Sequence, residues 1–187
     1  MEELRRIAQE EKKIIGGKPT VYRYWDSGNI KFVDLYMADD RPDEGVKTCA
    51  AIGLSKTDIQ LESDNKDLRI ELVGACDNSI EFFPNIIATT AFEIMDKGES
   101  CYGDIIDNVI SEYVKDSEMA HAYLMSPFLW EDLDTIEFPD KWVTWLLVVP
   151  ISEKEKKYAI RNGYDALEDL FVEKQIDIYD IHRTSVV

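Results

Sequence analysis

The stretch TWLLVVPISEKEKKYAIRNGYDALEDLF, residues 144–171, is uncharged up to Ser152 and densely charged after it. A membrane-spanning helix needs about 20 apolar residues, and the uncharged run from Trp142 to Ile151 is too short to be one. Because this run does not alternate apolar and polar residues, it predicts a central strand with both faces covered. Ser152 and Glu155 have the spacing of a capping box, which predicts that a helix begins there.

The residues that follow complete the carboxyl-terminal part of the chain. Asn162-Gly163 predicts an interruption or a kink in the new helix, and an apolar stripe continues beyond it through Leu167 and Phe171. The tail IDIYDIHRTSVV, residues 176–187, alternates apolar and polar side chains, which predicts a last strand.

The amino-terminal part predicts one helix and four strands. The helix covers residues 2–15, where apolar positions recur at helical spacing before Gly16-Gly17. Turn residues split TVYRYW from IKFVDLYMA, which predicts a hairpin. VKTCAAIGLS predicts a third strand, and in LRIELVGAC the polar Arg69 and Glu71 predict a fourth strand with one wet face.

The middle of the chain predicts two helices and two strands. Apolar residues recur at three and four positions from Pro84 to Lys97, and again over residues 103–114, so both segments are expected to be helical. HAYLMSPFLW and WVTWLLVVPI predict strands, separated by the acidic link at residues 131–140. The chain is therefore expected to form one α+β (mixed α/β) domain over residues 1–187, with a mostly antiparallel or mixed central sheet and flanking helices.

Charge is distributed unevenly along the chain. The chain has 21 Lys and Arg against 38 Asp and Glu, a net charge of −17, and residues 91–140 carry two basic and 13 acidic side chains. Such a field repels nucleic acid and anionic membranes, so the expected partner is a basic protein. Acidity that serves only solubility explains the total charge, but it explains the clustering less well.

Recognised chemical signatures are absent from the sequence. No phosphate-binding loop, hydrolase elbow or HExxH motif occurs, so no catalytic residue, metal or cofactor is expected. The cysteines, Cys49, Cys76 and Cys101, have no disulfide or zinc spacing. A metal-dependent enzyme stays open as an alternative, and it requires His121 or His182 to meet carboxylates in a cleft. The amino terminus has no signal-peptide pattern, and we expect a cytoplasmic protein.

The acidic link interleaves carboxylates with apolar residues. Exposed apolar anchors ringed by charge are typical of protein recognition. Alternatively, a solvated loop tucks these apolar residues onto the core. The candidate partner-binding residues are Asp104, Asp107, Glu112, Trp130, Glu131, Asp132, Asp134, Glu137 and Asp140.

Several segments resemble the suppressor-of-fused domain family over roughly residues 20–187. They are the strand WVTWLLVVPIS, the helix start EKEKKYAIRNG, the continuation YDALEDLF, the ending DIHRTSVV, the segment VKTCAAIGLSK with Thr48, Gly53, Leu54 and Ser55, and CYGDIID. The resemblance implies a mixed sheet with flanking helices, and the family pattern supplies no catalytic residue to carry over.

The same resemblance implies a function in binding proteins. Stand-alone bacterial relatives are associated with polymorphic toxin systems as immunity proteins, including the antitoxin partner of an LXG-type DNase toxin. The expectation is therefore an antitoxin that occludes a cognate basic toxin, with a nuclease favoured. The alternative is a regulatory adaptor that, like the animal member, binds a transcription factor or peptide.

Overall fold

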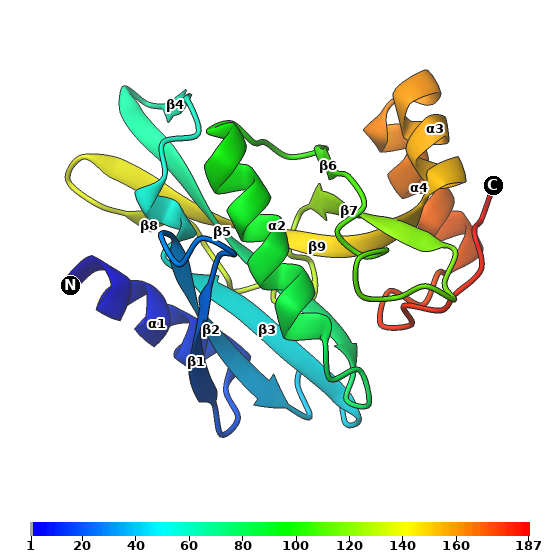
Figure 1. Ribbon diagram of the computed structural model, residues 1–187. Helices are drawn as coiled ribbons and strands as arrows, with labels where there is room; N and C mark the ends of the chain where they lie inside the picture. Colours follow the sequence, from blue (N-terminus) through cyan, green and yellow to red (C-terminus); the bar gives the residue numbers. More distant parts are fainter. Residues whose placement is uncertain (1) are drawn as a thin grey trace.

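The structure is a computed structural model that describes residues 2–187 (Figure 1). Four α-helices and a short 3-10 helix are present: α1 Glu2–Ile15, α2 Phe83–Lys97, α3 Glu153–Asn162, α4 Tyr164–Lys174 and η1 Leu54–Lys56. The strands are β1 Thr20–Trp25, β2 Phe32–Asp39, β3 Val46–Ile52, β4 Leu61–Ser63, β5 Lys66–Asp77, β6 Ile105–Ile106, β7 Met119–Met125, β8 Ile136–Glu137 and β9 Lys141–Ser152.

All nine strands belong to one mixed sheet. Its order is β1-β2-β3-β5-β9-β7-β6, with β4 paired to β5 and β8 paired to β9. The β5–β9 pair is parallel and every other pair is antiparallel. The expected mixed, mostly antiparallel sheet with flanking helices is confirmed.

Hydrophobic cores lie on both faces of the sheet. Helix α2 crosses one face, and α1 lies with α3 and α4 on the other (Figure 1). Strand β9 contributes alternately, with Leu146 and Val148 in the α2 core and Trp145, Leu147 and Val149 in the opposite core. The prediction that β9 is a central strand covered on both faces is confirmed.

The junction that follows β9 forms as predicted. The Ser152 hydroxyl accepts a 3.1 Å hydrogen bond from the Glu155 amide, and the Glu155 carboxylate accepts a 2.9 Å bond from the Ser152 amide. This capping box starts α3. Gly163 separates α3 from α4 and has a φ of 95°. Residues with a Cβ rarely adopt that backbone conformation, which explains why a glycine occupies the position.

Residues 103–114 do not form the predicted helix. Ile105 and Ile106 pair with β7 instead, and a series of turns follows. Asn108 has a left-handed φ of 63°, and its amide donates a 3.0 Å hydrogen bond to His121 Nδ1. Val109, Ile110 and Val114 thus pack in the α2 core from turns and not from a helix. These tertiary contacts outweigh the helical spacing of the apolar residues in the sequence.

Three strand predictions also need correction. The predicted strand over residues 121–130 begins at Met119 and ends at Met125, because residues 127–130 form a turn. Residues 176–187 contain no strand, since side-chain contacts rather than a ladder hold that segment. The wet face expected for β5 is absent, because Glu71 is fully buried beneath α1.

Among the described residues, no helix is both long enough and apolar enough to span a lipid bilayer.

Candidate functional site

The predicted partner-binding acids do not form one surface. Glu137 lies opposite Trp142 near the start of β9, whereas Ile106, beside Asp107, aligns through β7 with Pro150 near its end. Eight residues of strand separate these positions, about 26 Å at the usual rise. Asp104, Asp107 and Glu112 therefore lie at one end of β9, and Glu137 and Asp140 lie at the other.

Some of these acids already have partners within the chain. The Asp104 carboxylate accepts a 2.9 Å hydrogen bond from the Cys101 amide, and Asp107 forms an ion pair with Lys156. Glu137 pairs with Lys66 at 2.6 Å. The following acids are exposed and have no side-chain ion pair within residues 2–187: Glu112, Glu131, Asp132, Asp134 and Asp140.

The apolar residues of the acidic link are buried. Trp130, Leu133, Ile136 and Phe138 are each at most 8 % exposed and pack in the core that faces α1 and α4. The interpretation of these residues as exposed anchors is wrong, and the alternative of a loop tucked onto the core is correct. Trp130 therefore cannot contact a partner in this conformation, while the carboxylates beside it remain at the surface.

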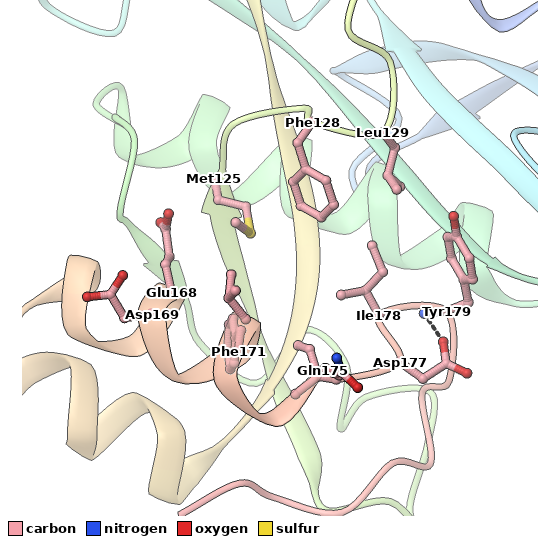
Figure 2. Close-up of a pocket in the computed structure, with 12 residues that line it drawn as sticks. Met125, Phe128, Leu129, Glu168, Asp169, Phe171, Gln175, Asp177, Ile178 and Tyr179 are labelled. Atoms are coloured by element: carbon pink, nitrogen blue, oxygen red, sulfur yellow. Dashed lines mark hydrogen bonds between the residues drawn. The ribbon is translucent and has the colours of Figure 1, made fainter.

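An apolar groove lies between α4, the turn that follows β7 and the segment that follows α4 (Figure 2). Its volume is about 510 Å³. The apolar lining includes Met125, Phe128, Leu129, Phe171, Val172 and Ile178. Phe128 is 50 % exposed and Val172 is 79 % exposed, so large apolar side chains face solvent at this site. Such a surface is characteristic of protein contacts.

The charged residues of the groove all carry the same sign. Glu168, Asp169 and Asp177 contribute carboxylates, and no lysine or arginine is among the described residues that line it. Glu131 and Asp132 follow directly after the turn that supplies Phe128 and Leu129. We call this set the acid-rimmed groove: an apolar floor bordered by Glu168, Asp169 and Asp177.

Tyrosine hydroxyl groups fix the Glu168 side chain at the edge of the groove. Tyr123 in β7 donates a 2.6 Å hydrogen bond to Glu168, and Tyr102 donates bonds of 2.7 and 2.6 Å. Burial and the acceptance of these bonds by Glu168 raise the pKa of both tyrosines, so their hydroxyls remain protonated donors. The carboxylate is thus held in place by the sheet and by the loop before β6.

The opposite end of the groove is also held in place. The Asp177 carboxylate accepts a 2.9 Å hydrogen bond from the Tyr179 amide, the contact drawn in Figure 2. The Tyr179 hydroxyl donates a 3.0 Å bond to Asp43, and burial, followed by this bond, raises the pKa of Tyr179 to about 12. The groove is therefore a preformed surface rather than a gap between free segments.

The sequence interpretation missed this groove because its residues are far apart along the chain. Phe128 was placed within a strand, and Phe171 was recognised only as part of an apolar stripe. The sequence does offer one signal: Val172 lies next to the apolar stripe of α4 and widens its apolar face. In the structure the core does not cover this residue, and it remains exposed.

His121 meets the carboxylates that a metal-dependent enzyme would require, but its ring nitrogens are already engaged. Nδ1 accepts a hydrogen bond from the Asn108 amide, so Nε2 carries the proton that is donated to Glu153 at 2.9 Å. The side chain is 3 % exposed, and Lys156 and Lys157 pair with the neighbouring acids. No cluster of three potential ligands for a metal ion occurs within residues 2–187.

The buried Glu71 carboxylate explains the segment VKTCAAIGLSK, which resembles the suppressor-of-fused family. Glu71 accepts hydrogen bonds from the amides of Gly53, Leu54 and Ser55 at 2.7, 3.1 and 3.2 Å, and from the Ser55 hydroxyl at 2.7 Å. Burial nevertheless raises the pKa of Glu71 to about 7, against the effect of those bonds. The Gly-Leu-Ser segment therefore has a structural role, since it holds a buried carboxylate of β5.

Comparison with known proteins places this arrangement among characterised folds. The chain is 42 % identical to Immunity protein YqcF of Bacillus subtilis (strain 168), and the match covers 97 % of this chain and 99 % of the relative. A crystal structure of a putative SUFU homolog from Neisseria gonorrhoeae superimposes with a TM-score of 0.76 at 15 % identity, covering 100 % of this chain and 98 % of that one.

An animal relative shares the same fold. Drosophila Suppressor of Fused superimposes with a TM-score of 0.62 at 14 % identity, and the match covers 98 % of this chain and 50 % of that one. The family model described as Suppressor of fused protein (SUFU) matches residues 30–184. The chain belongs to the suppressor of fused (SUFU) protein family.

Proposed function

We propose that this chain is an immunity protein that neutralises a cognate toxin by covering part of the toxin's surface. The proposal draws on the 42 % identity to an immunity protein over nearly the whole of both chains. It assigns a binding role and no catalytic step to the chain.

The observation that carries the proposed binding mode is the acid-rimmed groove. An apolar floor supplies binding free energy by excluding water, while carboxylates of one sign select a basic partner and accelerate its capture. Glu131 and Asp132 are exposed and follow the turn residues Phe128 and Leu129 along the chain, so they add to the negative charge of this part of the protein. The remaining acids of the candidate set do not line the groove and would act mainly through the long-range field.

The basic partner that this surface best fits is a toxin that cleaves nucleic acid. A nuclease must attract a polyanion, so its active-site surface carries positive charge. A protein with net charge −17 can occupy that surface by presenting carboxylates where the nucleic acid would present phosphates. Electrostatic steering would also speed the capture of the toxin before it acts.

The experiment compares two variants that each remove four negative charges. The groove variant carries Asp169→Asn and Asp177→Asn in the acid-rimmed groove, with Glu131→Gln and Asp132→Asn at exposed positions that follow its turn residues Phe128 and Leu129. The control variant carries Glu62→Gln, Asp64→Asn, Glu81→Gln and Glu93→Gln, at exposed positions on β4, at or near α2, or in adjacent turns.

Association with the cognate toxin, isolated by a pull-down with this chain as bait, is measured by stopped flow at several salt concentrations. The groove variant should associate about tenfold or more slowly at low salt and show a flatter salt dependence, whereas the control should stay near wild type. Equal effects of both variants would show that only net charge matters. No effect of either variant would show that the toxin binds without electrostatic steering.

A further inference from the structure

Strand β1 forms an outer edge of the sheet that no other strand covers within residues 2–187. It pairs with β2 over six residues in continuous register, from Thr20↔Met37 to Trp25↔Phe32. Proteins usually protect such edges with prolines, bulges, several charges or very short strands. In β1 the only charged side chain is Arg23, and the strand contains neither a proline nor a bulge.

The backbone groups that face outward can be assigned from the hairpin. The Asp26 amide donates a 3.0 Å hydrogen bond to the Lys31 carbonyl. Because bonded and non-bonded pairs alternate in an antiparallel ladder, Thr20, Tyr22 and Tyr24 bond inward to β2. The amides and carbonyls of Val21, Arg23 and Trp25 therefore point away from the sheet.

Apolar side chains surround this free edge. Val21, Tyr22 and Trp25 are 54 %, 59 % and 48 % exposed, and Ile30 in the hairpin turn is 81 % exposed. These are four of the ten exposed large hydrophobic side chains in residues 2–187, although the hairpin is short. A hollow of about 450 Å³ lies on the sheet face that carries Tyr22 and Tyr24, and its other lining residues include Met37 of β2, Lys47 of β3 and Pro84 of α2.

The side chain of Arg23 argues against a second copy of this chain as the occupant. Antiparallel pairing of two β1 edges with full overlap would place Arg23 opposite Arg23 of the other copy, and like charges directly opposite are destabilising. Asp34 accepts bonds of 2.8 and 3.0 Å from Nε and Nη2 of Arg23, while Nη1 makes no hydrogen bond within residues 2–187 and can donate to a partner's carboxylate. A net charge of −17 on each copy adds repulsion.

We propose that β1 captures an extended segment of a partner protein, which joins the sheet as an additional strand. The segment carries apolar side chains opposite Val21 and Trp25 and a carboxylate opposite Arg23. Main-chain hydrogen bonds supply the affinity, and the alternate side chains supply the selectivity, as in other cases of strand addition. This site lies on the β1 edge, whereas the acid-rimmed groove is lined by α4 and by the segments after β7 and α4. The site also prefers the opposite charge, so it does not depend on the proposed toxin contact.

The probe is the synthetic peptide TITETIT, acetylated and amidated, titrated into the ¹⁵N-labelled full chain. We expect shift changes at the amides of Val21, Arg23 and Trp25, together with slower hydrogen exchange at these amides. The peptide TITKTIT should bind about fivefold more weakly, the size expected when an opposite charge is replaced by a like charge. A TITETIT peptide with N-methyl groups on alternate residues should lose binding, because it cannot donate to the edge.

Two variants separate the backbone from the side chain. Arg23→Pro removes an outward amide without removing a bond to β2, so it should abolish binding; Arg23→Gln should keep binding but lose the preference for TITETIT. Should Arg23→Pro disturb the hairpin, the N-methylated peptide tests the same point on the wild-type chain. Equal binding of methylated and unmethylated peptides, no changes in β1, or dimerisation through β1 in sedimentation would overturn the proposal.

Discussion

Tyr123 in the sheet donates a 2.6 Å hydrogen bond to Glu168 on α4, which fixes one wall of the acid-rimmed groove. The tyrosine is fully buried, whereas the carboxylate reaches the groove surface. The bond therefore links the rigid centre of the protein to the surface proposed for toxin binding.

Removal of this bond should loosen the groove. Tyr123→Phe is expected to lower the free energy of unfolding by about 1 kcal/mol, because one hydrogen bond to a partly solvated carboxylate is lost while Tyr102 still donates to Glu168. Urea denaturation measures the change. Tyr24→Phe is the control, and an unchanged midpoint for Tyr123→Phe would show that the bond does not contribute to stability.

Stability should decrease from mildly acidic to mildly alkaline pH because of two buried carboxyl groups. Burial, with Glu71 nearby, raises the pKa of Glu11 well above the ordinary 4.5, and burial raises that of Glu71 to about 7. Raised folded-state values mean that the stabilisation is complete below about pH 4.5 and is lost as pH rises through the folded-state pKa. For Glu71 this loss amounts to about 3 kcal/mol.

Glu11→Gln tests the contribution of the first group. The Trp145 indole donates to Glu11 Oε1 at 3.1 Å, and a glutamine carbonyl can accept the same bond without ionising. The variant should therefore lose less stability than wild type between roughly pH 5 and pH 8, as followed by urea denaturation at each pH. Glu2→Gln at the exposed start of α1 is the control, and identical pH profiles for all three proteins would contradict the prediction.

The carboxyl-terminal segment should depend on one buried ion pair. Arg183 donates to Glu155 at 2.6 and 2.9 Å and to the Pro150 carbonyl at 2.8 Å. Arg183→Leu leaves a buried carboxylate without its partner, so it should lower the free energy of unfolding by about 3–5 kcal/mol. Arg183→Lys should recover only part of this loss, because an ammonium group cannot form the same paired bonds.

Arg161→Leu is the matched control for Arg183→Leu, since Arg161 is exposed on α3. It should change stability by less than about 0.5 kcal/mol. If both leucine variants had equally small effects, the buried pair would not hold the carboxyl-terminal segment in place.

The apolar floor of the groove should contribute to toxin affinity. Val172→Lys replaces an exposed groove residue with a cation, which should repel a basic partner and weaken binding at least tenfold without unfolding the chain. Ile160→Lys, at a residue 73 % exposed on α3 and outside the groove lining, is the control. Calorimetry with the toxin domain measures both, and equal affinities would place the toxin elsewhere.

The sequence predicted the parts of the fold that local patterns determine. The uncharged run before Ser152 and the capping box with Glu155 specify β9 and the start of α3 without reference to distant residues. The helix predicted over residues 103–114 failed because pairing with β7 and the contact between Asn108 and His121 replace helical bonds. Such competition is tertiary, and periodicity alone cannot reveal it.

The candidate site was harder to predict because it depends on solvent exposure. Acidity pointed toward a basic partner, but sequence proximity grouped acids that β9 holds about 26 Å apart. Trp130 looked like an exposed anchor among carboxylates, whereas the fold buries it and exposes Phe128 two residues earlier. Which apolar residues face solvent is decided by packing between distant segments.

Co-expression with the toxin isolated by a pull-down with this chain as bait tests the central claim most directly. Host growth is measured with the toxin alone, with the toxin and the wild-type chain, and with the toxin and the Val172→Lys variant. The account predicts that the wild-type chain restores growth and that a complex of the two proteins can be isolated, while the variant protects less. Continued killing in the presence of folded wild-type chain, with no complex formed, would contradict the account.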